Sequence, residues 1–274
     1  MEIFLGPGGN CITAKELGTE GSFKRLVELG LNAQEIEFVR NIYLKEKSAK
    51  EIGKLAKNYG IKLSVHAPYF INLLSEDSKK VEASIRRIMN TLYLAEAMEA
   101  EFVVVHAAYY GKYTKEQAIK RIEEVTRRIF NEMERLDIRK TKLAYETMAK
   151  ESQFGGLEEL LELKKKLKSK QFSICIDFAH LFVRGNGIIE YSKIFNLIKD
   201  FDYIHSHFSN VKYNIKEKKF VDIHVPMNSH PSFEDLAKEI LRRKINITII
   251  SESPKLELDS LKMKEIFEKF GYKF

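Results

Sequence analysis

A chain of 274 residues is longer than most domains, but (β/α)8 barrels regularly use this length as one domain. Its 44% hydrophobic and 31% charged residues are ordinary for a globular protein and exclude a disordered one. The net charge of +7 permits nucleic acid, phosphate or another acidic partner but selects none, because lysine-rich runs such as 164–168 and 216–219 are typical of solvated surfaces.

The cysteines and the N-terminal residues indicate in which cellular compartment the protein is expected. Cys11 and Cys175 are too few for a disulfide framework, which favours a reducing cytoplasm. Residues 1–6 lack a basic segment followed by a long apolar one, and no apolar run approaches the roughly 20 residues of a membrane span. We therefore expect a soluble, unsecreted, cytoplasmic monomer without a membrane partner.

Short β-rich apolar runs alternate with amphipathic helical patterns along the whole chain, which is the signal for βα units around a parallel sheet. The expected strands are residues 2–5, 34–38, 62–66, 102–106, 142–146, 173–177, 203–207 and 246–251. Each strand is expected to be followed by a helix.

Capping signals mark several helix starts. Ser22 and Ser48 are predicted N-caps, and Thr114 with Gln117 forms a capping-box pattern. Longer helical patterns cover residues 77–97, 114–136, 157–167, 232–243 and 260–270.

Eight βα units in this length fit a (β/α)8 TIM barrel better than a doubly wound open sheet, which usually has fewer strands or a second domain. We therefore predict an α/β protein with one barrel domain over residues 1–274. Residues 212–221 are expected to form a small hairpin insertion after the seventh strand.

Polar residues of one chemical kind follow the predicted strands from the third onward. The set consists of His66, His106, Glu146, Asp177, His180, His207, Asp222, His224 and Glu252. It contains five of the seven histidines in the chain. A single histidine or carboxylate here could be a core or capping residue, but strand ends of a barrel converge on one active face, so the set as a whole predicts a functional site.

Several carboxylates close together repel one another unless cations neutralise them, and imidazole with carboxylate suits zinc, or manganese and iron. Nine ligands exceed what one tetrahedral ion uses, so two or three ions are expected, with a carboxylate such as Glu146 bridging. Metal pairs of this kind serve phosphoryl chemistry, so a phosphate ester is the expected substrate.

Local spacing divides the ligands further. Asp177 ends a strand and His180 lies one turn later, so these two could serve different ions. Asp222 and His224 share one side of an extended segment. His207 is preferred as a ligand over His205, for which a buried structural role and a supporting role beside the metal remain open.

The ordered motifs resemble those of the endonuclease IV family of abasic-site endonucleases, also called AP endonuclease family 2, in the xylose-isomerase-like barrel superfamily. The resemblance spans almost the whole chain. The motifs that carry it are His66-Ala67-Pro68-Tyr69-Phe70-Ile71-Asn72-Leu73, Val105-His106, Tyr145-Glu146-Thr147, Cys175-Ile176-Asp177-Phe178-Ala179-His180, His207-Phe208-Ser209-Asn210-Val211-Lys212, Asp222-Ile223-His224 and Ser251-Glu252-Ser253-Pro254.

The resemblance implies a zinc-dependent hydrolase of base-excision repair that cleaves double-stranded DNA 5′ to an abasic nucleotide. Its three zinc ions would be held by His66, His106 and Glu146, by Asp177, His207 and Glu252 with Glu146 bridging, and by His180, Asp222 and His224. Glu146, Asp177 and Glu252 would be catalytic, and Tyr69 would contact the DNA, although packing explains this tyrosine equally well.

The chain departs from the family pattern where the substrate would bind. Gly6-Pro7-Gly8-Gly9 stands where the family has a histidine, Ala107-Ala108-Tyr109 follows His106 in place of Pro-Gly-Ser, and Thr147 replaces an asparagine. The glycine-rich run could offer N–H groups to a phosphate, but it does not fit a P-loop and a plain turn is favoured.

Two alternatives remain. A sugar isomerase or epimerase of the same superfamily would need only a Glu, Asp, His, Glu pattern, and a non-catalytic barrel would bind DNA or phosphate around structural metals.

Overall fold

The computed structural model describes residues 1–274 except for the side chain of Lys15. The chain forms two compact units. The first unit comprises Met1–Glu35, Tyr59–Ile61 and Ile176–Phe274, and the second comprises Ile36–Asn58 and Lys62–Cys175. The prediction of a single domain stays a prediction.

Eight parallel strands form the main sheet in the order β1-β12-β9-β8-β6-β4-β3-β2. They are β1 (Ile3–Pro7), β2 (Ala33–Glu37), β3 (Lys62–His66), β4 (Phe102–Val105), β6 (Lys142–Glu146), β8 (Phe172–Asp177), β9 (Ile204–Phe208) and β12 (Ile247–Ser251). Beyond β1, a parallel bridge pairs Gly8 with Glu35 of β2. This is the strand order of a (β/α)8 barrel, so the predicted fold class is confirmed, and each predicted strand overlaps an observed one.

Helices follow the strands of the main sheet, and two short antiparallel pairs of strands lie in the loops between them. The helices are α1 (Gly18–Glu28), α2 (Glu46–Tyr59), α3 (Ser78–Ala97), α4 (Lys115–Arg135), α5 (Leu157–Leu167), α6 (Phe178–Arg184), α7 (Tyr191–Leu197), α8 (Phe233–Arg243) and α9 (Glu257–Lys269), with a 3-10 helix η1 (Ile12–Leu17) before α1. The pairs are β5 (Ala108–Tyr109) with β7 (Gln153–Phe154), and β10 (Asn210–Asn214) with β11 (Lys219–Val225). The predicted hairpin is therefore confirmed and is longer than expected.

Some predicted helix starts are confirmed and others are wrong. Thr114 caps α4 in a complete capping box with Gln117. Ser22 lies inside α1, because its hydroxyl donates to Gln34 and accepts from the backbone N–H of Cys11. Ser48 lies inside α2, and α9 begins at Glu257 rather than at residue 260. Helices α6 and α7 were not predicted, since seven residues show too little periodicity.

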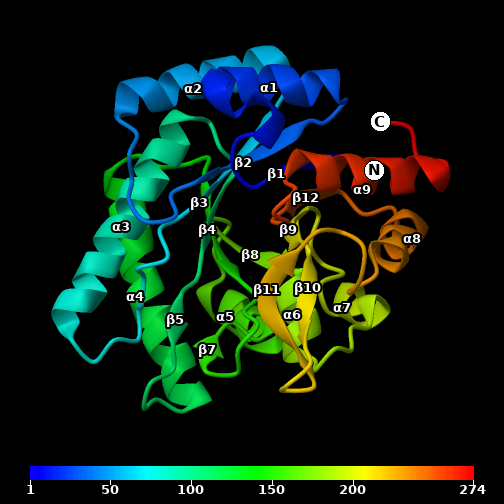
Figure 1. Ribbon diagram of the computed structural model, residues 1–274. Coiled ribbons are helices and arrows are strands. Elements are labelled where there is room, and N and C mark those ends of the chain that lie inside the picture. The colour runs from blue at the N-terminus through cyan, green and yellow to red at the C-terminus, as the bar shows by residue number, and fades with distance from the viewer. The chain divides into compact units, whose positions relative to one another are not determined.

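In the first unit, α9 packs on β1 and β12 and α8 packs beside α9 (Figure 1). Phe233 of α8 joins them, with its ring 4.9 Å from Phe208 and 5.5 Å from Phe267 between centroids. Strands β1 and β2 pass so closely that a Cβ on Gly6 would lie 1.6 Å from the carbonyl oxygen of Ala33. Only glycine fits there, which explains the glycine where β1 is expected to end.

In the second unit, α3, α4 and α5 pack in succession, and α3 lies against β3 and β4 (Figure 1). The buried Tyr145 of β6 shares a hydrogen bond of 2.8 Å with Thr126 of α4. This bond fixes the strand that ends at Glu146. None of the helices in the described residues has the length and apolar composition needed to cross a membrane.

Candidate metal centre

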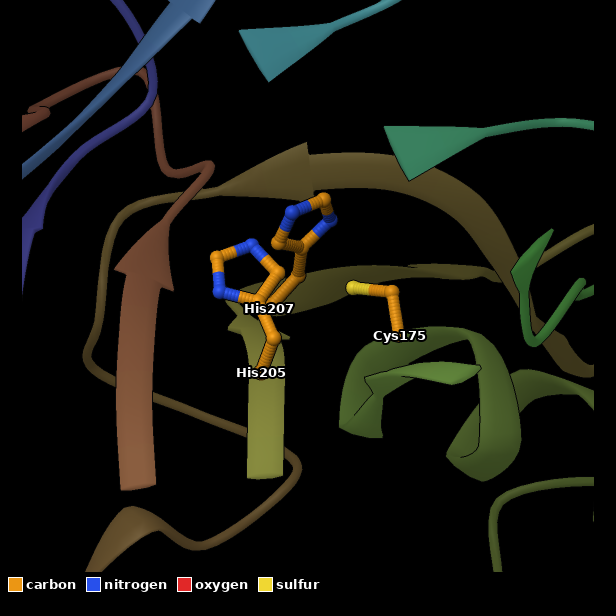
Figure 2. A group of neighbouring side chains, drawn as sticks. All are labelled: Cys175, His205 and His207. Atoms are coloured by element: carbon orange, nitrogen blue, oxygen red, sulfur yellow. The ribbon is translucent and has the colours of Figure 1, made fainter. Parts of the chain in front are cut away.

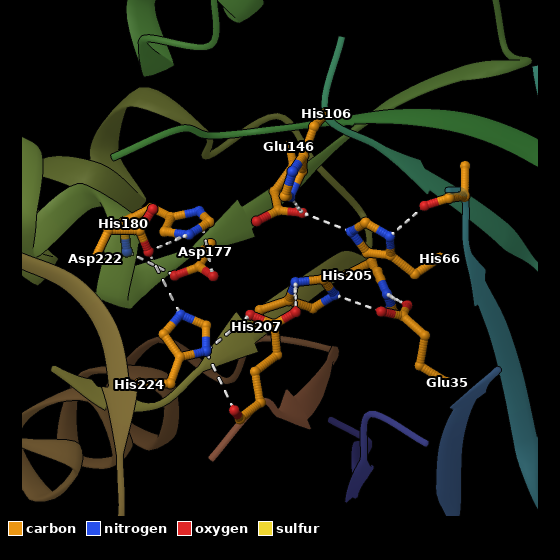
Figure 3. A network of polar contacts seen from close by, with 12 residues as sticks. Glu35, His66, His106, Glu146, Asp177, His180, His205, His207, Asp222 and His224 are labelled. Atoms are coloured by element: carbon orange, nitrogen blue, oxygen red, sulfur yellow. Dashed lines mark hydrogen bonds and ion pairs between the residues drawn. The ribbon is translucent and has the colours of Figure 1, made fainter. Parts of the chain in front are cut away.

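The second unit brings His66, His106 and Glu146 together at the ends of β3, β4 and β6 (Figure 3). Glu146 Oε2 lies 3.3 Å from His66 Nε2 and 3.0 Å from His106 Nε2. His66 and Glu146 are buried, and His106 is partly exposed. Each residue stands at or directly after the C-terminal end of a parallel strand, so neighbouring strands deliver the three donors to one place.

The backbone fixes the tautomer of His66. Its Nδ1 lies 2.8 Å from the carbonyl oxygen of Ala67, which only accepts hydrogen bonds. A neutral His66 therefore carries its proton on Nδ1 and presents Nε2 to the carboxylate of Glu146, 3.3 Å away. A ring held in this way by a backbone carbonyl is typical of a metal ligand.

The first unit forms another group around α6 and the hairpin (Figure 3). Asp177 caps α6 by accepting the backbone N–H of His180 at 2.7 Å. His180 Nδ1 lies 3.4 Å from Asp177 Oδ2, and its Nε2 lies 3.3 Å from Asp222 Oδ1. Asp222 and His224 are each about a fifth exposed on β11 whereas Ile223 between them is 52% exposed, so the two ligand types share the inner side of the strand as predicted.

His224 is oriented like His66. Its Nδ1 lies 3.2 Å from the carbonyl oxygen of Glu252, so Nδ1 carries the proton. Its Nε2 is buried, makes no hydrogen bond with any described residue, and lies 3.8 Å from Asp222 Oδ1. A buried nitrogen lone pair beside a carboxylate, with no donor to satisfy it, fits a cation.

Strand β9 carries His205 and His207 on one face, as Figure 2 shows. His207 Nδ1 lies 3.3 Å from Glu252 Oε1, and Asp177, His207 and Glu252 have ligand atoms within 4.8 Å of one another. The other ring nitrogen of His207 lies 2.8 Å from Glu35 Oε1, and His205 Nε2 lies 3.0 Å from Glu35 Oε2.

Glu35 is the polar residue that the sequence did not single out. It is fully buried in the middle of β2. Burial raises its pKa, but the positive charge of His207 and the hydrogen bonds from both histidines outweigh this effect and hold the pKa well below the ordinary value. A carboxylate inside a short strand, next to Ile36 and two residues after Ala33, was the signal that could have revealed it.

The distances within each unit fit metal coordination. Donors bound 2.0–2.2 Å from a tetrahedral ion lie roughly 3.3–3.6 Å apart. The nitrogen to oxygen separations of 3.3 Å at His66, His180 and His207 fall in this range. These groups in both units could therefore hold a metal ion, and all nine predicted ligands lie beside other members of the set.

Two further predictions concern the loops. The ring of Tyr69 is 47% exposed, and its centroid lies 5.4 Å from those of His66 and His106. The run from Gly6 to Gly9 is neither a phosphate loop nor a plain turn, because the N–H groups of Gly8 and Gly9 donate to Ser251 and Glu35 and so continue the sheet.

Comparison with known proteins gives both sequence relatives and structural neighbours. The chain is 33% identical over 275 residues to an uncharacterized protein of Methanocaldococcus jannaschii, with 94% of each chain covered. It is 30% identical over 168 residues to a probable endonuclease 4 of a Sulfurihydrogenibium species, covering 57% of this chain and 59% of that one.

Solved structures share the fold at lower identity. Endonuclease IV of Thermus thermophilus has a TM-score of 0.70 at 20% identity over 98% of both chains. A D-tagatose 3-epimerase-like protein has a TM-score of 0.71 at 22% identity, covering 98% of this chain and 97% of that one. The resemblance to endonuclease IV is thus confirmed at the level of family and fold. A family model matches residues 23–268, so the chain belongs to the xylose isomerase-like TIM barrel family.

Proposed function

We propose that the protein is a metal-dependent phosphodiesterase that cleaves DNA on the 5′ side of abasic sites, as an endonuclease IV-like enzyme of cytoplasmic base-excision repair. The observation that carries the proposal is the group formed by His180, Asp222 and His224. Its donors lie 3.3 Å and 3.8 Å apart, and His224 is locked by a backbone carbonyl. Two of its members come from a hairpin inserted after β9.

The same group argues against sugar isomerisation. Moving a proton between carbons needs the Glu146, Asp177, His207 and Glu252 pattern but no ligands from the hairpin. That reaction does not need His66 and His106 either. These two residues lie 3.3 Å and 3.0 Å from Glu146. Two or three ions suit in-line displacement at phosphorus better, because both the attacking and the leaving oxygen require stabilisation.

The side chains have separate tasks in this proposal. His66, His106 and Glu146 would hold one ion, while His180, Asp222 and His224 would hold another and Asp177, His207 and Glu252 would supply further ligands. When bound, the ions supply an activated water and positive charge at the leaving oxygen. The catalytic carboxylates Glu146, Asp177 and Glu252 position these charges, and the ring of Tyr69 offers an aromatic face beside His66 and His106.

A DNA partner agrees with the charge of the chain and its hairpin. The net charge is +7, and the hairpin turn carries Lys216, Lys218 and Lys219 in exposed positions. Cations at this place would contact phosphates and would make binding salt-dependent.

A duplex with one tetrahydrofuran abasic analogue tests the proposal. We expect a single nick 5′ to the analogue with Zn²⁺, Mn²⁺ or Fe²⁺ and none after chelation. Glu146→Gln should abolish cleavage, while an undamaged duplex should stay intact. Absence of cleavage with every metal would reject the proposal.

Similarity to a D-tagatose 3-epimerase-like structure favours a second candidate, a sugar epimerase. Incubation with ketohexoses, followed by chromatography of the products, measures this activity. Salt-dependent DNA binding without cleavage or epimerisation would instead favour a non-catalytic barrel with structural metals.

A further inference from the structure

Glu35 is placed between two imidazoles rather than beside solvent. Each of its carboxylate oxygens meets one ring nitrogen, Oε1 with His207 Nε2 at 2.8 Å and Oε2 with His205 Nε2 at 3.0 Å. All three side chains are buried, with exposed fractions of 0%, 0% and 1% for Glu35, His207 and His205. The contact with His205 is a hydrogen bond, and the contact with His207 is an ion-pair contact at close range.

The contacts with Glu35, a hydrogen bond from His205 and an ion-pair contact with His207, indicate which nitrogen of each ring carries a proton. An ionised carboxylate only accepts hydrogen bonds, so both histidines present N–H at Nε2. A His207 ring that binds a metal carries a single proton, and with that proton on Nε2 the lone pair lies on Nδ1, which faces Glu252 Oε1 at 3.3 Å. That separation is the spacing of two ligands on one tetrahedral ion.

The backbone around Glu35 is also fixed. Gly9 donates its N–H to the carbonyl oxygen of Glu35 at 2.9 Å, and Gly8 pairs with Glu35 across the sheet. The glycine-rich end of β1 thus holds the strand that delivers the carboxylate.

We infer that Glu35 is a positioning residue that fixes the ring orientation and tautomer of His207, so that Nδ1 of His207 is a metal-binding nitrogen beside Glu252. His205 is the second donor to the same carboxylate and keeps Glu35 in place. This inference rests on the proposed function, because it assigns a role within the same metal centre. Outer partners of this kind typically change metal affinity by about 10–100-fold.

Glu35→Gln tests the role. Its amide places an oxygen and an NH2 group where the carboxylate has two oxygens, so one of the two rings would face a donor and would have to present a lone pair instead of an N–H. We expect zinc affinity, measured by competition with a chromogenic chelator, to fall by about 10–100-fold. The visible absorption of the Co²⁺-substituted protein should change as well. Glu35→Asp retains both acceptor oxygens and should recover part of the affinity.

A second readout needs no metal. Nitrogen-15 NMR of histidine-labelled protein without metal should show an Nε2–H on both His205 and His207 in the wild type and the loss of at least one of these N–H groups in Glu35→Gln. Glu257→Gln is the matched control, because Glu257 is also a fully buried carboxylate, and it accepts from the N–H groups of Ile12 and Thr13. It should leave the zinc affinity and both tautomers unchanged.

The results of these experiments distinguish the positioning role of Glu35 from the proposed function. Unchanged zinc affinity, Co²⁺ spectrum and tautomers in Glu35→Gln would overturn the role of Glu35, even if the enzyme cleaves abasic DNA. A wild-type protein that binds no zinc would reject the metal centre and the role together. Zinc binding that depends on Glu35, without cleavage, would reject only the proposed reaction.

Discussion

Replacing Glu146 with glutamine should have opposite effects on stability with and without metal. In the metal-free protein, a neutral His66 with its proton on Nδ1 beside Ala67 presents the Nε2 lone pair to the buried carboxylate of Glu146 at 3.3 Å. A glutamine amide can donate to that nitrogen. Removing such a buried mismatch is worth about 1–3 kcal/mol.

The size of the effect follows from the chain length. At roughly 2–3 °C per kcal/mol, metal-free Glu146→Gln should melt about 2–9 °C above the metal-free wild type. Zinc should reverse the order, because saturation at about 1,000 times Kd stabilises the wild type by about 4 kcal/mol and the variant lacks a ligand. Scanning calorimetry at pH 8, with chelator and with zinc, measures both differences. A variant that melts lower by the same amount under both conditions would refute the reasoning.

Three further predictions concern separate parts of the molecule. His224→Asn should remove one equivalent of zinc and leave the His66 group loaded, which elemental analysis of dialysed protein would check; loss of all the metal would contradict separate groups. Tyr69→Ala should weaken binding to abasic DNA by about 1–3 kcal/mol if its ring stacks on a base, whereas Tyr69→Phe should bind normally; fluorescence anisotropy measures both, and equal loss in both would exclude stacking. Asp259→Asn should destabilise the fold by about 1–3 kcal/mol at pH 7, because buried Asp259 accepts from Met227 and Ser253 and pairs with Lys262. Burial raises the pKa of Asp259, but Lys262 and these hydrogen bonds lower it by more, so the pKa in the folded protein lies below that in the unfolded chain. The contribution of Asp259 to stability is therefore present above the unfolded-state pKa and is lost as the pH falls through the folded-state pKa. Urea unfolding of the variant and the wild type should therefore differ at pH 7 and converge in acid, and an equal difference at both pH values would contradict this.

Most of the proposed ligands could be recognised in the sequence because their position follows from a local rule. His66 and Glu146 end apolar runs, and parallel strands carry such ends to one edge of the sheet. Asp222 and His224 were recognisable because alternate residues of an extended segment share a side. Both signals depend only on residues that are close together in the sequence.

Glu35 could not be recognised in the same way. It lies in the middle of β2, and its partners His205 and His207 are 170 and more positions away in the chain. Ser22 misled for a similar reason, since its hydroxyl bonds to Gln34 rather than capping a helix. Both side chains take their roles from tertiary contacts, which periodicity and capping signals do not report.

Anomalous diffraction at the zinc edge from zinc-loaded crystals tests the central claim most directly, since it counts the ions and identifies their ligands. The account predicts three ions, one on His66, His106 and Glu146, one on His180, Asp222 and His224, and one with His207 Nδ1 and Glu252 among its ligands. A single ion, with His180, Asp222 and His224 free of metal, would contradict it and would favour a sugar epimerase.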